Sequence, residues 1–326
     1  MTRLISALAL LLGLQFGACI PTVQAANYPS QPLQRAVAIT FDDLPFVSGN
    51  RKYSELRELS AQLLRQINTD AVPAVGFVNE SKLYVSCELD TQGVAILEDW
   101  LAMGLELGNH TYSHASLNQL PFANFTQDVI RGETVTKRLM AEHGRPLRYF
   151  RHPFLHVGKD THTRAAFEEF LSDRGYTVAP VTINSGEWVF AAAYDKAALQ
   201  GDEAVMRRVA DAYVPYMEQV FKSAELQSFD LFGYEIKQVL LLHANALNAA
   251  HFADLVAMIK RRGYTFITLE AALQDRAYLS PNTYAGTEGL SWLDQWARTF
   301  GLRPRQKGEV PLFVRQLAGR AAYIGY

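Results

Sequence analysis

Residues 36–46 read AVAITFDDLPF, an apolar run that leads directly to two adjacent carboxylates, Asp42 and Asp43. The apolar run predicts a strand. Side chains alternate between the two faces of a strand, so neighbouring carboxylates reach one site only where the strand ends and the chain turns. The stretch therefore predicts a strand-end site. The alternative for an isolated pair is one turn-capping Asp and one solvated Asp.

The same order of apolar run and helical pattern recurs along the chain. Strand-like runs are predicted at 35–41, 72–79, 105–110, 147–154, 176–184, 237–245 and 264–269, and helical segments at 54–68, 92–104, 125–144, 164–175, 202–227 and 249–263. About seven repeats of strand and helix indicate parallel strands joined by crossover helices. We therefore expect an α/β fold, either a (β/α) barrel or a doubly wound sheet.

Polar side chains of matched chemical kinds follow these predicted strands. Besides the acid pair, they are His110 and His114, Arg151, Glu187 with Trp188, and His243. In a barrel the functional residues collect at the carboxyl ends of the strands. The pattern therefore predicts that these side chains share one site.

The spacing of the two histidines indicates a metal site. His110 and His114 are four residues apart, which on one helical turn places both imidazoles on the same face. Two histidines and one carboxylate, either Asp43 or Asp42, would bind a divalent metal and leave positions free for water and substrate. A single histidine would more often be a core or surface residue.

A metal with open positions beside a second carboxylate suggests hydrolysis. The spare Asp would take a proton from water, His243 would protonate the leaving group, and Arg151 would pair with the base carboxylate. Taken singly, Arg151 fits a surface salt bridge and His243 a buried structural imidazole. Their occurrence in one set favours the catalytic roles.

Composition limits the classes of partner. The 326 residues carry a formal charge of -2 and are 49% hydrophobic, without basic clusters, so no nucleic-acid partner is expected. Residues 1–25 have the pattern of a secretory signal with cleavage after Ala25, which predicts a periplasmic or secreted protein without a transmembrane segment in its mature chain. Lipidation at Cys19 is the minority alternative. Cleavage would leave Cys87 as the only cysteine, so no intramolecular disulfide is expected.

Five short motifs together resemble the polysaccharide deacetylases with a NodB homology domain, carbohydrate esterase family 4. In chain order they are TFDD (40–43), HTYSH (110–114), RHPF (151–154), EW (187–188) and LLH (241–243). The resemblance extends over about residues 35–270. It implies a distorted (β/α) barrel with about seven parallel strands.

The resemblance also implies a role for each residue. Asp42 would be the general base and His243 the general acid, with Arg151 orienting Asp42. Asp43, His110 and His114 would hold the metal, zinc by preference, with Co²⁺, Mn²⁺ or Ni²⁺ as alternatives.

By the same resemblance, Trp188 and Leu241 would wall the acyl pocket, and the backbone N–H near Phe154 would stabilise the oxyanion. Glu187 is counted with the substrate-binding residues. The family more often has Asp at that position, and Tyr where Phe154 stands, so the chain is placed in a divergent branch.

The implied reaction removes an acetyl group from an amino-sugar nitrogen, or from a sugar hydroxyl, of an acetylated polysaccharide or oligosaccharide. Peptidoglycan, chitin-type oligomers, an exopolysaccharide and acetylated xylan all fit. We predict the catalytic domain at 26–275, with a helical insertion at 184–235 and a C-terminal extension at 276–326 that packs on the barrel. His152 and His156 are expected near the site without being ligands.

Two other classes of function are compatible with the scaffold. One is an amidase or cyclic imidase that acts on a small non-carbohydrate amide, in some relatives without metal. The other is a binding protein without turnover, which would be expected to lack Asp42 or His243. Both residues are present, and the metal-ligand set is complete, so the deacetylase is favoured.

Overall fold

The computed structural model describes residues 35–47 and 51–319 of the chain. The predicted signal segment at 1–25 and Cys19 lie outside the described residues. No helix in the described ranges has the length and hydrophobicity needed to cross a membrane.

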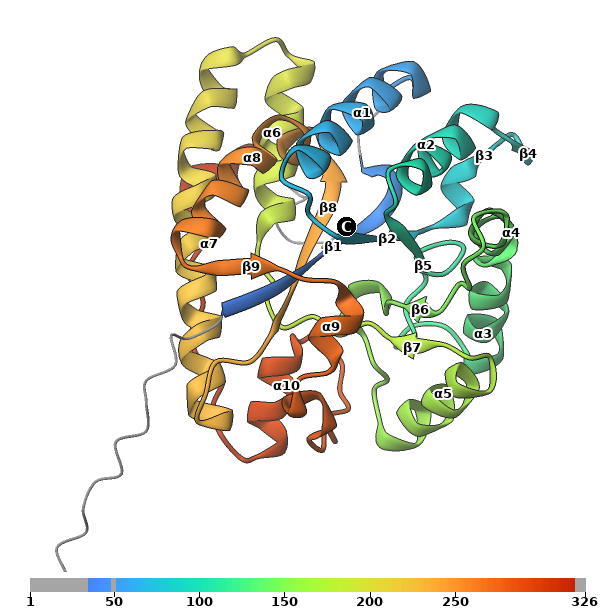
Figure 1. Cartoon of the computed structure of the whole chain (residues 1–326), viewed down its shortest axis with the longest axis vertical. Helices are drawn as coiled ribbons and strands as arrows, with labels where there is room; N and C mark the ends of the chain where they lie inside the picture. The colour runs from blue at the N-terminus through green and yellow to red at the C-terminus, as the bar shows by residue number, and fades with distance from the viewer. Residues whose placement is uncertain (1–34, 48–50, 320–326) are drawn as a thin grey trace, which may run out of the picture. The chain divides into compact units, whose positions relative to one another are not determined.

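A curled, parallel sheet of seven strands forms the centre of the fold (Figure 1). Its order is β7-β6-β5-β2-β1-β8, and β9 also pairs with β1. The strands are β1 (Arg35–Val47), β2 (Ala74–Val78), β5 (Glu106–Asn109), β6 (Tyr149–Phe150), β7 (Thr177–Val178), β8 (Gln238–Asn245) and β9 (Tyr264–Phe266). All pairings within this sheet are parallel. The prediction of a distorted (β/α) barrel is confirmed.

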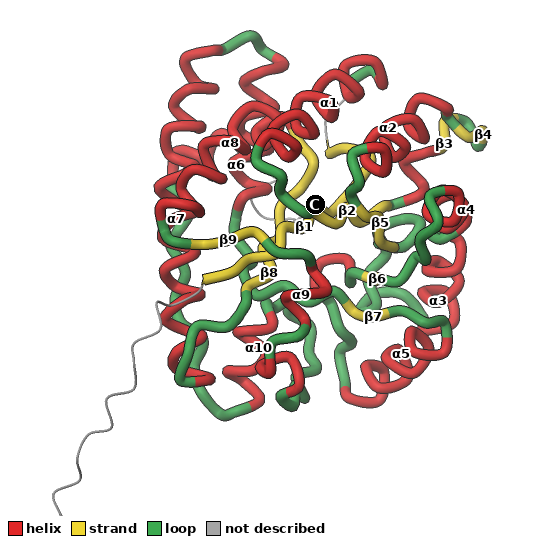
Figure 2. Tube along the Cα trace, viewed as in Figure 1, coloured by secondary structure: helices red, strands yellow, loops and turns green. Residues whose placement is uncertain are grey.

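Helices surround the curled sheet (Figure 2). They are α1 (Tyr53–Thr69), α2 (Thr91–Ala102), α3 (Phe122–Arg131), α4 (Thr134–Glu142), α5 (Thr161–Asp173), α6 (Glu187–Leu199), α7 (Glu203–Phe232), α8 (Ala246–Arg261), α9 (Leu269–Leu273), α10 (Trp292–Thr299) and α11 (Leu312–Ala318). Short 3₁₀ turns lie at η1 (Glu80–Leu83), η2 (Pro153–Leu155) and η3 (Arg276–Leu279), and a small hairpin pairs β3 (Tyr84–Val85) with β4 (Glu88–Leu89).

Aromatic packing fixes helices against the central strand. Phe41 of β1 is fully buried and packs edge-on against Trp100 of α2, with ring centroids 5.5 Å apart. On its other side it contacts Phe252 of α8 at 5.6 Å. Burying an aromatic side chain of this size stabilises a fold by about 1.5–3 kcal/mol. The residue directly before the acid pair is therefore held firmly in the core.

The strand that carries the acid pair does not end there, contrary to the prediction. β1 continues to Val47, but its pairing with β2 shifts register between Phe41 and Leu44. At the same place Asp43 has a left-handed φ of 69°. This irregularity breaks the alternation of side chains. It lets adjacent residues serve one site from within a strand.

One predicted helix is divided in two. The segment 125–144 forms α3 and α4, which separate at Gly132. A Cβ at Gly132 would lie 2.5 Å from the carbonyl carbon of Thr111, so the break coincides with a close approach to the histidine loop. Sequence periodicity continues across the break because both helices bury one face.

The predicted insertion is mainly helical, whereas the described part of the predicted extension is mostly loop with two short helices. Residues 184–235 contain α6 and α7, and the region after residue 275 contains α10 and α11. α10 contacts α7, and α11 contacts α6. The domain boundaries themselves stay predictions.

Candidate active site

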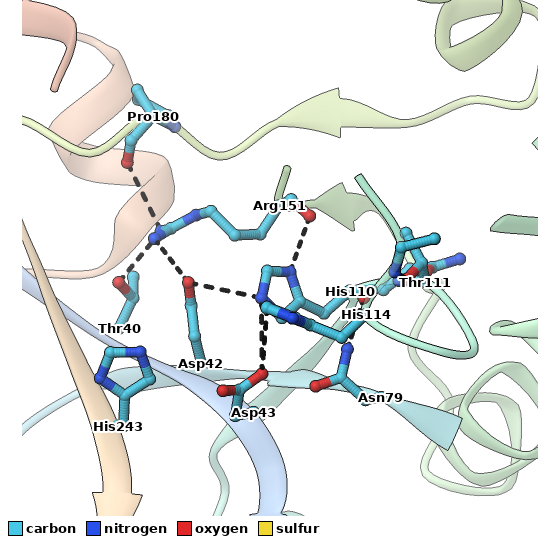
Figure 3. Close-up of polar contacts among 12 residues, drawn as sticks. Thr40, Asp42, Asp43, Asn79, His110, Thr111, His114, Arg151, Pro180 and His243 are labelled. Carbon is cyan, nitrogen blue, oxygen red and sulfur yellow. Dashed lines mark hydrogen bonds and ion pairs between the residues drawn. The ribbon is translucent and has the colours of Figure 1, made fainter. Parts of the chain in front are cut away.

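Asp42 and Asp43 are buried, and they lie close to Arg151, His110 and His114 (Figure 3). Asp42 Oδ2 accepts a hydrogen bond from Arg151 Nη1 at 3.3 Å. Arg151 is 1% exposed and also donates to the Thr40 hydroxyl at 3.0 Å. Arg151, which Thr40 holds in place, therefore fixes the orientation of the Asp42 carboxylate.

Burial and charge act in opposite directions on Asp42. Burial raises the pKa of Asp42 and outweighs the lowering by the Arg151 guanidinium and by His243, so that it reaches about 6. The other oxygen, Oδ1, is buried and has no hydrogen-bond partner among the described residues. A carboxylate with its pKa near neutrality and a free lone pair is suited to accept a proton.

Asp43, His110 and His114 form a group that could hold a metal ion. One ligand atom from each lies within 4.8 Å of the others. Asp43 Oδ1 is 3.7 Å from His110 Nε2 and 3.5 Å from His114 Nε2, and it has no hydrogen-bond partner among the described residues.

The protonation states expected for these three side chains are the ones that bind a cation. Burial lowers the pKa of both His110 and His114, which favours neutral imidazoles. Burial alone would raise the pKa of Asp43, but the Lys82 ammonium and the nearby imidazoles together outweigh burial and hold that pKa below its usual range. His110 Nδ1 donates to the Arg151 carbonyl at 2.8 Å, so its Nε2 lone pair is free toward Asp43. Two neutral imidazoles and one carboxylate are the donor set of an open divalent-metal site.

A loop rather than a helical turn brings the two histidines together, which corrects the sequence argument. Residues 110–114 are not helical, and Thr111 and His114 have φ values of 65° and 56°. The Asn109 side chain accepts from the Thr111 N–H at 2.7 Å. Asp128 of α3 accepts from both the N–H and the hydroxyl of Ser113, each at 3.0 Å. Side chains outside the motif therefore shape the loop.

His243 lies in β8 beside Asp42, with which it pairs in register. Its Nδ1 donates to Glu187 Oε2 at 2.8 Å. Burial lowers the pKa of His243, but the charge of Glu187 and this hydrogen bond outweigh burial and raise it to about 9. His243 is therefore protonated at neutral pH and can donate a proton.

Two asparagines complete the environment of Glu187. Asn245 and Asn248 donate to its Oε1, at 2.5 and 2.7 Å, and Asn248 also donates to the His243 carbonyl at 2.9 Å. Glu187 is 1% exposed and lies behind His243 rather than on the cavity wall. The structure therefore places it against the imidazole and not where a substrate would contact it.

A cavity of about 360 Å³ opens above these groups. It is lined by Asp42, His110, His114, His152, Phe154, Leu155, His156, Asn184, Trp188, Leu241, His243 and Gly289. Both proposed acyl-pocket residues, Trp188 and Leu241, are on its wall. His152 and His156 also line it, and His156 Nδ1 is 2.8 Å from the Ser116 hydroxyl.

Several contributors to this site were not identified from the sequence. They are Thr40, Lys82, Asn245, Asn248 and Gly289. Thr40 lies inside the first motif, and Asn245 and Asn248 follow the last motif by two and five residues, so their positions carried a signal. Gly289 is far from every motif, and nothing in its sequence context indicated the site.

Comparison with known proteins agrees with this geometry. Residues 30–170 match the family model described as polysaccharide deacetylase. The matched range contains the first three motifs, TFDD, HTYSH and RHPF. No curated protein matches the sequence.

Solved structures that match the chain include members of carbohydrate esterase family 4. A family 4 carbohydrate esterase from Streptomyces lividans is 18% identical, with 74% of this chain and 96% of that chain covered and a TM-score of 0.44. A peptidoglycan N-acetylglucosamine deacetylase is 17% identical, with coverage of 73% and 88% and a TM-score of 0.47. A mutant, with restored activity, of a Bacillus anthracis pseudoenzyme of this family is 14% identical, with coverage of 74% and 69% and a TM-score of 0.47.

Proposed function

We propose that this protein is a metal-dependent hydrolase that removes acetyl groups, N-acetyl groups of amino sugars above all, from an envelope or extracellular polysaccharide. One observation carries the proposal. Asp42, which is suited to accept a proton, and His243, which is suited to donate one, line one cavity together with the metal-ligand candidates His110 and His114. The third candidate, Asp43, lies beside both of these histidines.

Asp43, His110 and His114 would hold the ion, and its mixed oxygen and nitrogen ligands favour zinc. A divalent ion bound there supplies a Lewis acid and lowers the pKa of water. The side chains and backbone of this chain carry out the proton transfers and hold the acetyl group.

Asp42 is the base in this mechanism. It takes one proton from a water in the cavity while the water oxygen bonds to the acetyl carbon. Arg151 keeps the carboxylate oriented through the 3.3 Å hydrogen bond. The unpartnered Oδ1 of Asp42 is the atom free to receive the proton.

His243 is the acid. An amine is a poor leaving group unless it is protonated. When the carbon–nitrogen bond breaks, the protonated His243 supplies that proton to the nitrogen. Glu187 stabilises the charged imidazole before the transfer. The products are acetate and a free amine, and an O-acetyl group would leave as the sugar hydroxyl by the same route.

The acetyl group itself would be held by the cavity wall. Trp188 and Leu241 offer apolar surface to the methyl group, and the Phe154 N–H would donate to the oxygen that becomes negative. Phe154 has a left-handed φ of 56°, a backbone conformation that is uncommon for a residue other than glycine. Export through residues 1–25, with signal cleavage after Ala25, belongs to the same proposal because it gives access to such polymers.

Acetate release by the purified mature protein tests the proposal. The substrates would be N-acetylglucosamine oligomers, peptidoglycan and acetylated xylan, each with added zinc and with chelator. Release from one substrate that chelator abolishes and zinc restores is the expected result. No release from any of them by zinc-loaded protein would overturn the proposal and favour the small-amide hydrolase.

A further inference from the structure

A segment of the C-terminal extension lies against the loops of the active site. We call residues 282–292 the strap. On one side of its centre, Gly286 donates to the Gly158 carbonyl at 2.9 Å and its own carbonyl accepts from Asn118 at 3.0 Å. On the other side, the Trp292 N–H donates to the Val181 carbonyl at 2.7 Å. The strap is therefore anchored on both sides of Gly289, its cavity-lining residue.

Gly289 touches the backbone of the third motif. A Cβ at this position would lie 1.8 Å from the carbonyl oxygen of Phe154 and 3.0 Å from its carbonyl carbon. The φ of Gly289 is outside the left-handed region that favours glycine. Glycine is needed here because of the close approach alone.

The backbone that Gly289 touches is in an unfavourable conformation. Phe154 and Leu155 both have φ values of 56°, and neither is a glycine. Consecutive left-handed residues of this kind persist only where their surroundings hold them. The Phe154 ring packs on His114, with centroids 4.3 Å apart, which holds the side chain. The strap supplies the contact on the carbonyl side.

We propose that Gly289 is a positioning residue for the deacetylation reaction. Because Gly289 has no side chain, the anchored strap can contact the Phe154 carbonyl directly. This contact fixes the turn in which the Phe154 N–H faces the acetyl oxygen. The strap also closes the cavity wall beside Phe154 and His156. The inference rests on the proposed function, because it assigns the strap a task in that reaction.

Gly289→Ala is the direct test. Contact between the new methyl group and the Phe154 carbonyl requires the two to separate from 1.8 Å to at least 3.0 Å, a displacement of more than 1 Å. Misplacing a group at the reacting centre by that distance lowers rate by about 10²-fold. We expect kcat to fall by that order, while KM and the zinc dissociation constant stay within about threefold of wild type.

Gly308→Ala is the matched control. It lies in the same extension, and its new Cβ would meet the Gln219 side chain, with Oε1 at 2.8 Å, rather than backbone. We expect wild-type kcat from it. Wild-type kcat in Gly289→Ala, or a zinc affinity that falls as much as kcat does, would overturn the proposal.

Two further measurements separate this inference from the proposed function. The amide peak of Phe154 in a ¹⁵N–¹H spectrum should move in Gly289→Ala and stay in place in Gly308→Ala, whether or not any substrate is turned over. An unmoved peak would overturn the positioning role. If Gly289→Ala does not fold, Asn118→Ala loosens the strap by one hydrogen bond, and it should lower kcat severalfold at unchanged zinc affinity. An unchanged kcat there would also overturn the proposal.

Discussion

The substitution Glu187→Gln should move the alkaline limit of activity to lower pH. Glu187 is buried against His243, and its charge together with the 2.8 Å hydrogen bond is what raises the pKa of that imidazole. Glutamine keeps the shape and still accepts from the two asparagines, but it has no charge. The acid would then lose its proton at a lower pH.

The size of the effect follows from the pKa of His243. It is raised from 6.5 to about 9, a difference of about 2.5 units, although burial works in the opposite direction. One pKa unit corresponds to about 1.4 kcal/mol, so Glu187 and the smaller contributions of Asp42 and Asp43 stabilise the imidazolium by roughly 3 kcal/mol net of the burial penalty. Since Glu187 is the largest favourable contribution, its neutralisation should lower the pKa of His243 by about two units.

The direction of the pH dependence follows from the role of His243 as an acid. An acid acts while it is protonated, so activity is present below the pKa of His243 and is lost as the pH rises through it. The assay is kcat/KM for acetate release by zinc-loaded protein over the alkaline range. A bound metal ion also affects the pKa of His243, but it does so in both wild type and Glu187→Gln. The difference between their two pH profiles therefore measures the effect of Glu187.

Glu80→Gln is the matched control for this profile. Glu80 is also fully buried, but it accepts from the N–H groups of Val135 and Thr136 and is not among the groups that shift the pKa of His243. Its profile should coincide with that of wild type. An alkaline limb that stays in place in Glu187→Gln would refute the assignment of His243 as the acid tuned by Glu187.

Three other predictions concern stability. Arg151→Met leaves the Asp42 carboxylate buried without its ion pair, and urea denaturation should show a loss of about 3–5 kcal/mol in the free energy of unfolding. Zinc at 100 times its dissociation constant should raise that free energy by about 2.7 kcal/mol, and His114→Ala should abolish the gain in the same titration. Phe41→Ala removes a ring packed between two helices and should lower stability by about 3–5 kcal/mol, without changing the pH profile that Glu187→Gln moves.

Much of the fold was predictable because strands and helices alternate with clear periodicity. The apolar run before Asp42 became the central strand, and the expected seven-stranded parallel sheet was found. The short strands β6 and β7, two residues each, were predicted too long because buried loop residues are as apolar as strand residues. The long pattern at 125–144 concealed a break, since the close approach at Gly132 depends on a segment distant in sequence.

The positions of the site residues were predictable to a similar degree. The sequence expectation that the motif side chains share one site agrees with the cavity, but two local arguments were wrong. Asp42 and Asp43 lie at an irregularity inside β1, and His110 and His114 lie on a loop. Both arrangements depend on left-handed φ values at Asp43, Thr111 and His114, which are uncommon outside glycine and are held by the surrounding structure.

Partners from distant parts of the chain could not be predicted from spacing. Gly289 reaches Phe154 through a strap that is anchored by two backbone–backbone hydrogen bonds and one from the Asn118 side chain. Hydrogen bonds between backbone groups do not depend on residue type, so the sequence does not reveal them. The asparagines around Glu187 are a different case. Asn245 caps α8 by accepting from the Asn248 N–H at 2.9 Å, and the same two side chains hold the carboxylate. A capping pattern gave no indication of the second task.

The central claim is that the two adjacent acids divide the labour, with Asp42 moving the proton and Asp43 binding the metal. The most direct test measures zinc stoichiometry and acetate release together in Asp42→Asn and His110→Ala. The account predicts that Asp42→Asn keeps one zinc per chain and loses turnover, whereas His110→Ala loses both. A folded Asp42→Asn protein that binds no zinc, or one that keeps wild-type turnover, would contradict the division.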